Sequence, residues 1–132
     1  MTRQHAFLPL FRKFISNSRT GKRLNKDGTR IKQQTVSNYD YCFKLLQNFS
    51  VEKEFELVIH ESRGTNKREH TRLKRYWGNF YKQFIDYLYK DKGCFDNYTG
   101  QTIKIIRTFF NWLSNDAGIV TGPYVSLRLS TP

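Results

Sequence analysis

The chain has 132 residues, which predicts a single domain, and 16% of them are aromatic, which supplies large side chains for a core. Lysine and arginine outnumber aspartate and glutamate by 23 to 11, so the formal net charge is +12. No run of 18 apolar residues occurs and the charged N-terminus does not have the pattern of a secretory signal, which excludes a membrane span and a signal peptide of the usual kind.

So much positive charge on a small domain repels itself, which indicates a polyanionic partner. Nucleic acid fits better than an anionic membrane, because no basic amphipathic helix with a dense Lys/Arg face is evident from the sequence. A basic solvated surface without a partner is the competing interpretation. Cys42 and Cys94 lie far apart, so we expect free thiols and a cytoplasmic protein.

A first helix is predicted within residues 1–18. Because proline is tolerated only in the first turn, Pro9 places the start of this helix near Phe7 or Leu8. Its buried face consists of Phe7, Phe11, Phe14 and Ile15. Residues 19–34 then carry six Lys or Arg and one acid, and Asp27-Gly28 predicts a tight turn. This segment is either a disordered linker or an ordered arm that faces DNA.

A second helix is predicted over residues 35–50, with Thr35 as its N-cap. Its buried stripe has helical spacing and consists of Val36, Tyr39, Phe43, Leu46 and Phe49. Cys42 lies beside this stripe, and we expect it to pack as a small apolar residue.

Residues 51–70 are the least regular part of the chain. The stretch 51–59 partly alternates between apolar and polar residues, which is compatible with an extended segment. Residues 51–61 hold four of the eleven acids, so this edge should face away from a polyanion. Residues 62–71 are polar and basic and are predicted to form a mobile loop.

A helical hairpin is the strongest structural prediction. The third helix is predicted over 71–91 and the fourth over 97–116, with Gly93 ending the first of them and Asn97 or Thr99 capping the second. The buried stripe of the third helix is Leu73, Tyr76, Trp77, Phe80, Phe84 and Leu88. That of the fourth is Ile103, Ile106, Phe110 and Leu113, widened by Ile105, Phe109 and Trp112.

These elements predict an all-α fold, a small bundle of four to five helices with an irregular segment between the second and third. Residues 1–120 are predicted to form the helical domain and residues 121–132 a tail. No catalytic, cofactor or metal motif is evident. The histidines do not pair with cysteine or a carboxylate at metal-ligand spacing, and no phosphate-binding glycine loop occurs.

Two helix starts and the basic arm supply the candidate DNA contacts. Helix N-termini suit phosphates, and Gln and Asn also read adenine edges in a major groove. The candidates in the arm and at the start of the second helix are Lys22, Arg23, Arg30, Lys32, Gln33, Thr35, Ser37 and Asn38. Those on the fourth helix are Asn97, Tyr98, Thr99, Gln101, Lys104 and Arg107. For either helix alone, ordinary capping and a solvated face compete with this interpretation.

A further basic strip runs along the third helix. It consists of Lys67, Arg68, Arg72, Lys74, Arg75 and Lys82. A solvated face is at least an equal interpretation for it.

Several blocks of the chain together resemble a known family. They are LPLFRKFI, GKRLNKDGTRIKQQTVSNY, YWGNFYKQFIDYLY and CFDNYTGQTIKIIRTFFNWL. In this order, over roughly residues 5–125, they resemble the core-binding (phage-integrase SAM-like) domain of tyrosine recombinases, especially integrases of Bacteroidetes-type mobile elements. The resemblance implies a half-clamp on double-stranded DNA at a core recombination site, whose second and fourth helices approach the major groove.

The resemblance also implies partners and a place in the cell. The partners would be a C-terminal catalytic domain of the same protein, joined after residues 121–132, and other recombinase protomers, in a bacterial cytoplasm at the nucleoid. The family's tyrosine, arginine and HxxR boxes are not matched, and His60 and Arg63 lie in the wrong region, so this chain should bind DNA and cut nothing. A stand-alone helical regulator or interaction module is the alternative, which the long connection between the second and third helices disfavours.

Overall fold

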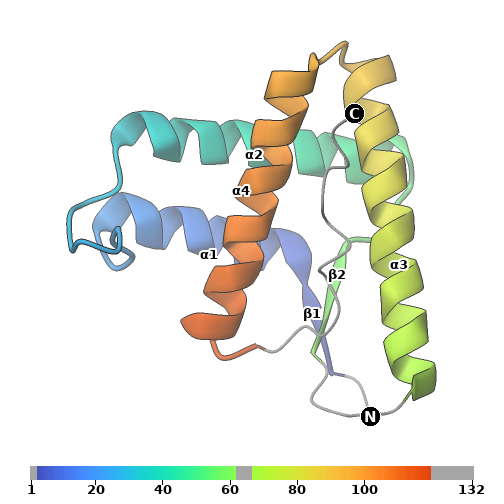
Figure 1. Cartoon of the computed structure of the whole chain (residues 1–132), viewed down its shortest axis with the longest axis horizontal. Coiled ribbons are helices and arrows are strands. Elements are labelled where there is room, and N and C mark those ends of the chain that lie inside the picture. The colour runs from blue at the N-terminus through green and yellow to red at the C-terminus, as the bar shows by residue number, and fades with distance from the viewer. Residues whose placement is uncertain (1–2, 62–66, 120–132) are drawn as a thin grey trace. The chain divides into compact units, whose positions relative to one another are not determined.

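The computed structural model describes residues 3–61 and 67–119 (Figure 1). The elements are β1 (Arg3–Ala6), α1 (Phe7–Thr20), α2 (Gln33–Glu52), β2 (Val58–Glu61), α3 (Lys67–Asp86), the π-helical η1 (Tyr87–Asp91) and α4 (Asp96–Asn115). The predicted helical fold class is confirmed, with a small two-stranded sheet added to it. The chain divides into two compact units, Ala6–Val58 and the combination of Met1–His5 with Ile59–Pro132, which are called the α1–α2 unit and the α3–α4 unit below.

In the α1–α2 unit, the two helices pack through aromatic side chains. The rings of Phe14 and Tyr39 are 4.9 Å apart and those of Phe11 and Phe14 are 5.6 Å apart. The predicted start of α1 near Phe7 or Leu8 is confirmed, since the helix begins at Phe7. The helix ends at Thr20, two residues later than predicted, where Gly21 takes a left-handed conformation with φ 88°. Cys42 is buried in this unit, as predicted.

The arm between α1 and α2 is ordered by its own turn. Gly28 has φ 85°, and the Asp27 carboxylate accepts hydrogen bonds from the Thr29 N–H at 3.1 Å and the Thr29 hydroxyl at 2.6 Å. Leu24 and Arg30 form an antiparallel bridge across the turn. The predicted tight turn at Asp27-Gly28 is therefore confirmed, and the segment is not a featureless linker.

The start of α2 differs from the prediction. The helix begins at Gln33 after Lys32, and no side chain caps it. The Val36 N–H already donates to the Lys32 carbonyl at 3.1 Å, so Thr35 is inside the first turn and the prediction of Thr35 as N-cap was wrong. The helix extends to Glu52, and its buried side includes Leu45 and Cys42, whereas Phe43 is only half-buried.

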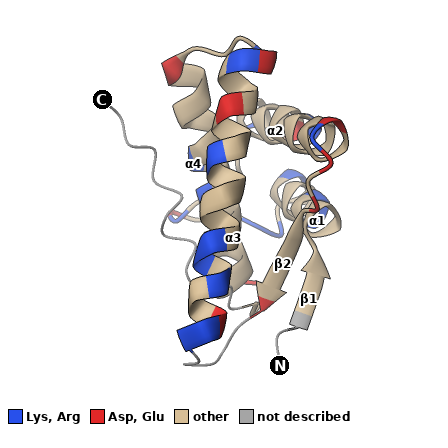
Figure 2. Ribbon diagram, turned by 90° about the vertical axis from the view of Figure 1, so that its right-hand side faces the viewer, with Lys and Arg blue, Asp and Glu red and all other residues tan. Residues whose placement is uncertain are grey.

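In the α3–α4 unit, β1 and β2 pair with opposite chain directions (Figure 2). The extended segment expected within residues 51–59 corresponds in part to β2. Strand β1 was not predicted, because a four-residue strand has little periodicity and its partner lies more than fifty residues away. A contact of 2.9 Å between His5 Nε2 and Glu61 Oε1 joins the strands. Glu61, one of the four acids in residues 51–61, therefore contacts a side chain of the same protein.

Helix α3 begins at Lys67, so the loop predicted for residues 62–71 was wrong from 67 onward, and 62–66 lie outside the described residues. The stretch Lys67–His70 contains no glycine or proline, and Glu69 in the first turn favours a helix start. The helix continues through η1 to Asp91, the predicted end, and the Lys92 N–H donates to the Tyr87 carbonyl at 3.1 Å. Gly93 follows with φ 63°, as expected of a helix stop.

Helix α4 begins at Asp96 with Phe95 as N-cap, so the predicted caps Asn97 and Thr99 were wrong. The Thr99 N–H donates to the Phe95 carbonyl at 2.9 Å, so Asn97 and Thr99 both lie within the first turn of the helix. The core of this unit joins α3 to α4, with the rings of Trp77 and Phe110 edge to face at 5.0 Å. The predicted tail at 121–132 lies outside the described residues. No helix in the described part of the chain has the length and hydropathy needed to cross a bilayer.

Candidate nucleic-acid interface

The outer side of α4 carries a row of polar side chains. The buried side of the helix is set by Ile103, Ile106 and Phe110, all 0% exposed. Five exposed residues on the remaining surface form what is here called the α4 polar face: Asn97, Gln101, Lys104, Arg107 and Asn111. The face is about 21 Å long at the helical rise per residue. No acidic residue occurs from Asn97 to Asn115, so nothing on this face of the helix repels a phosphate.

The first turn of α4 is less open than the sequence suggested. Asp96 sits in that turn, and its carboxylate accepts a hydrogen bond of 2.7 Å from the Tyr89 phenol, which raises the pKa of Tyr89. A carboxylate at a helix N-terminus already complements the partial positive charge there. A phosphate is therefore better accommodated along the α4 polar face than at the helix end.

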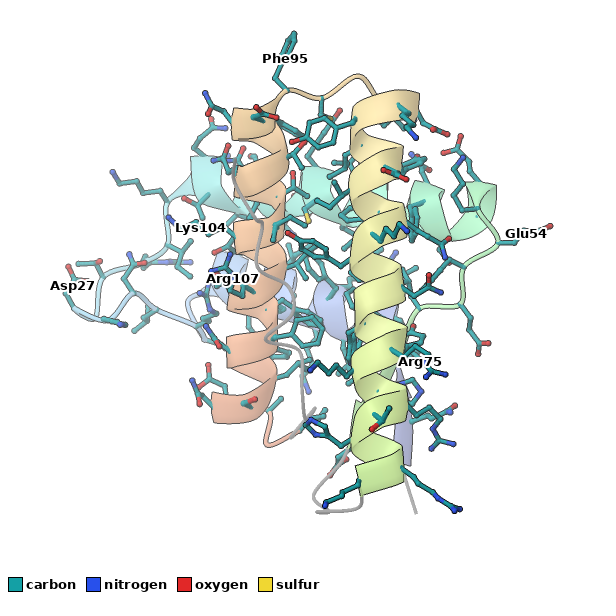
Figure 3. The ribbon with its side chains drawn as sticks, turned by 45° about the vertical axis from the view of Figure 1, so that its right-hand side comes forward. Asp27, Glu54, Arg75, Phe95, Lys104 and Arg107 are labelled. Carbon is teal, nitrogen blue, oxygen red and sulfur yellow. The ribbon has the colours of Figure 1, made fainter. Side chains whose placement is uncertain are left out.

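Two predicted contacts on α4 have unequal exposure. Thr99 is 0% exposed, so it belongs to the core and cannot touch a ligand at the surface, contrary to its selection as a candidate. Tyr98 is 36% exposed, so it can contribute to a surface contact. Phe95, at 83% exposure, projects away from the hairpin (Figure 3).

The basic residues of the arm have two different roles, one structural and one at the surface. The Arg23 guanidinium lies 4.8 Å from the centre of the Phe14 ring and donates to the Ser18 hydroxyl at 3.1 Å. Arg30 donates to the Arg19 carbonyl at 2.7 Å, which satisfies a carbonyl at the end of α1. Lys22 and Lys32 are exposed. Arg23 and Arg30 thus hold the arm against its own unit, and Lys22 and Lys32 remain as surface charges.

The start of α2 is open in the way that the start of α4 is not. Its first turn has no acidic residue, and no side chain of the N-cap residue accepts a hydrogen bond from the N–H groups there. Gln33 and Ser37 are exposed there, whereas Thr35 and Asn38 are half-buried, and Asn38 accepts a hydrogen bond of 3.2 Å from Gln34. A hollow of about 520 Å³ borders this turn and is lined by Arg19, Arg30, Ile31, Gln33, Val36, Ser37 and Asp40.

The basic strip predicted along the third helix lies on α3, although its residues were not among the candidate DNA contacts. Five exposed cations of α3, Lys67, Arg68, Arg72, Lys74 and Arg75, form what is here called the α3 basic face (Figure 2). Lys67 and Arg68 also fell in the loop predicted for residues 62–71, but the structure places both in the first turn of α3.

Nothing resembling a catalytic or metal site forms in the described residues. The His60 ring lies edge-on to Tyr76, with centroids 5.0 Å apart, and Arg63 of the same HxxR spacing is outside the described part. No group of three or more His, Cys, Asp or Glu is placed to hold a metal ion among residues 3–61 and 67–119.

The comparisons give no family. Protein-family models, curated proteins and solved structures were each compared with this chain, and none matches it. The resemblance to tyrosine recombinases stays a prediction from the sequence.

Proposed function

We propose that the chain binds double-stranded DNA through the α4 polar face. The observation that carries this proposal is the composition of that face: exposed side chains that are amide or cationic, on a 20-residue helix with no acid after its first turn. A helix is the element that fits a B-DNA major groove, and asparagine and glutamine pair with adenine edges there.

The residues of the α4 polar face divide by chemistry. Lys104 and Arg107 suit phosphate oxygens, which give affinity but carry no sequence information. Asn97, Gln101 and Asn111 are the side chains that could distinguish bases. On the α1–α2 unit, the first turn of α2 with Lys22 and Lys32 is a separate surface whose chemistry suits phosphate.

We further propose that this binding serves site-specific recombination. The support is the sequence resemblance to the core-binding domain of tyrosine recombinases, which assigns DNA cleavage to a separate catalytic domain. Under this proposal the present chain contributes affinity and position at the crossover site, and the catalytic domain and other protomers are its protein partners. It requires neither cofactor nor metal for this role.

A salt titration tests the DNA-binding part. Fluorescence anisotropy of a labelled duplex at 50 and 200 mM salt should give a log–log slope near −4.5 if about five phosphates are neutralised. The variant Lys104→Gln/Arg107→Gln should bind more weakly and have a slope smaller in magnitude by about 1.8, because two phosphate contacts are removed.

The control for this titration is Lys90→Gln, an exposed lysine of η1 whose ammonium lies 3.9 Å from Asp86. It should bind as the unaltered protein does. Binding that is independent of salt, or equal weakening by the control and the α4 variant, would reject the α4 polar face as the DNA contact.

A further inference from the structure

The α3 basic face has a higher density of positive charge than a helix needs in order to be solvated. Five of the nine residues from 67 to 75 are Lys or Arg. The one acid among them, Glu69, is half-buried, whereas all five cations are exposed. Among the described residues, no carboxylate lies within ion-pair distance of Lys67, Arg72, Lys74 or Arg75.

Like charges three or four residues apart on a helix repel each other and destabilise it. Arg68 and Arg72 are four residues apart and Arg72 and Arg75 three apart, so the three guanidinium groups share one side of α3. A shallow hollow of about 450 Å³ lies over this side, and Thr71 lines it together with Lys67, Arg68, Arg72 and Arg75. Guanidinium groups grip phosphate with two parallel hydrogen bonds, so this arrangement suits phosphate groups.

The α3 basic face and the α4 polar face point in different directions. The two helices meet through their buried sides, where Trp77 contacts Phe110, so their exposed sides are turned outward. In Figure 3, Arg75 lies on the side of α3 away from α4, and Lys104 and Arg107 lie on the side of α4 away from α3. A straight duplex held on the α4 polar face does not extend to the α3 basic face.

We propose that the α3 basic face binds the sugar-phosphate backbone of a second segment of double-stranded DNA. The inference rests on the proposed function, because it takes DNA as the ligand. It departs from that function in assigning a separate surface with no base readout, because the face consists of cations and the hollow over it adds only Thr71, with no asparagine or glutamine. One protein molecule would then hold two duplex segments together.

A bridging assay tests the proposal. One duplex is immobilised on beads, the protein is added, and capture of a second, fluorescent duplex is measured beside ordinary anisotropy with a single duplex. We compare the α3 variant Arg72→Gln/Lys74→Gln/Arg75→Gln with the charge-matched control Lys13→Gln/Lys44→Gln/Lys90→Gln, whose three lysines are exposed elsewhere. Circular dichroism shows whether each variant is folded.

We expect the α3 variant to capture at least about tenfold less of the second duplex, while its affinity for a single duplex changes by less than about threefold. The control should keep both activities. Equal bridging by the α3 variant and the control overturns the proposal, and so does a joint loss of bridging and single-duplex binding, which would make α3 part of one common site.

Two further outcomes separate this inference from the proposed function. If the unaltered protein binds no duplex at all, the DNA-binding proposal itself fails. If it binds one duplex without bridging, and a polyglutamate peptide binds the unaltered protein but not the α3 variant, the α3 basic face serves an acidic protein and the inference is overturned.

Discussion

Single side chains divide the basic arm into residues that hold the protein and residues that face solvent. Arg23 is half-buried, and its guanidinium lies over the adjacent rings of Phe14 and Tyr39, 4.8 and 5.8 Å from their centres. Lys22, its neighbour in the chain, is exposed. Two adjacent cations therefore have different effects when they are removed.

Replacement of Arg23 by glutamine should lower the free energy of unfolding by about 1–2 kcal/mol, because the cation–π contacts and the hydrogen bond to Ser18 are lost. Lys22→Gln is the matched control and should change it by less than about 0.5 kcal/mol. Urea denaturation followed by circular dichroism measures both. Equal stability of the two variants would contradict a structural role for Arg23.

The left-handed glycine after α1 gives a second test. Gly21 has φ 88°, a left-handed conformation that is costly for residues with a Cβ, so Gly21→Ala should destabilise the protein by about 1–2 kcal/mol. Gly78 is inside α3 and an added Cβ there meets nothing within 4 Å, so Gly78→Ala should stabilise it by up to about 1 kcal/mol. The two variants should shift the urea midpoint in opposite directions. A loss of stability in both variants would contradict the difference in backbone conformation between Gly21 and Gly78.

The two cysteines differ in reactivity because they differ in burial. Both are free, as predicted, and burial raises the pKa of the Cys42 thiol strongly and that of Cys94 less. A colorimetric thiol reagent should therefore react with one thiol in the native protein and with both in urea. In Cys94→Ser the native reaction should vanish, and rapid modification of Cys42 in that variant would show that the site is open.

The same shift affects stability at alkaline pH. Cys42 ionises in the unfolded chain above about pH 8.5 but keeps its proton in the native protein, so the native state binds more protons there. The contribution of Cys42 to the free energy of unfolding is therefore fully present below about pH 8.5 and is lost as the pH rises above it. Comparison of the pH dependence of unfolding between the unaltered protein and Cys42→Ala isolates it.

At the scale of an element, α3 combines good packing with unfavourable charge. Its buried side includes Leu73, Trp77, Phe80 and Phe84, each at most 1% exposed, while its first three turns carry the α3 basic face. Helix formation here is decided by burial of the aromatic side, and the repulsion between cations is tolerated because each pair costs only a few tenths of a kcal/mol.

Arg72→Gln should therefore stabilise the protein, by about 0.4–1 kcal/mol, since it removes the repulsion from Arg68 and Arg75. Lys82→Gln, at an exposed position nearly three turns further along α3, is the control and should leave stability nearly unchanged. The urea midpoint gives the comparison at low salt. A destabilised Arg72→Gln protein would mean that Arg72 makes a favourable contact in the native state.

At the scale of the whole molecule, the net charge of +12 acts on stability as well as on binding. Raising NaCl from 0.1 to 1 M shortens the screening length from about 10 to about 3 Å, so the melting temperature should rise by a few degrees. The Arg72→Gln/Lys74→Gln/Arg75→Gln variant should show a smaller rise. An unchanged or falling melting temperature in the unaltered protein would mean that internal repulsion is negligible.

The sequence alone determined the helical class, the α3–α4 hairpin with its stop at Gly93, and most of the buried residues, because helical periodicity and turn residues act over a few neighbouring positions. It could not place β1 against β2, whose pairing joins His5 to Glu61, because such a contact depends on segments far apart in the chain. Helix starts were also misplaced: Thr35, Asn97 and Thr99 have the chemistry of caps, yet the helices begin earlier without them.

The candidate surface divides in the same way. Its composition was visible in the sequence, including the polar residues spaced along 97–107. Only the tertiary structure decided which members are accessible: Thr99 turns into the core, Arg23 stacks on aromatic rings, and Lys67 and Arg68 join a helix face. Exposure is set by packing against residues distant in the chain, and no local pattern of residues contains that information.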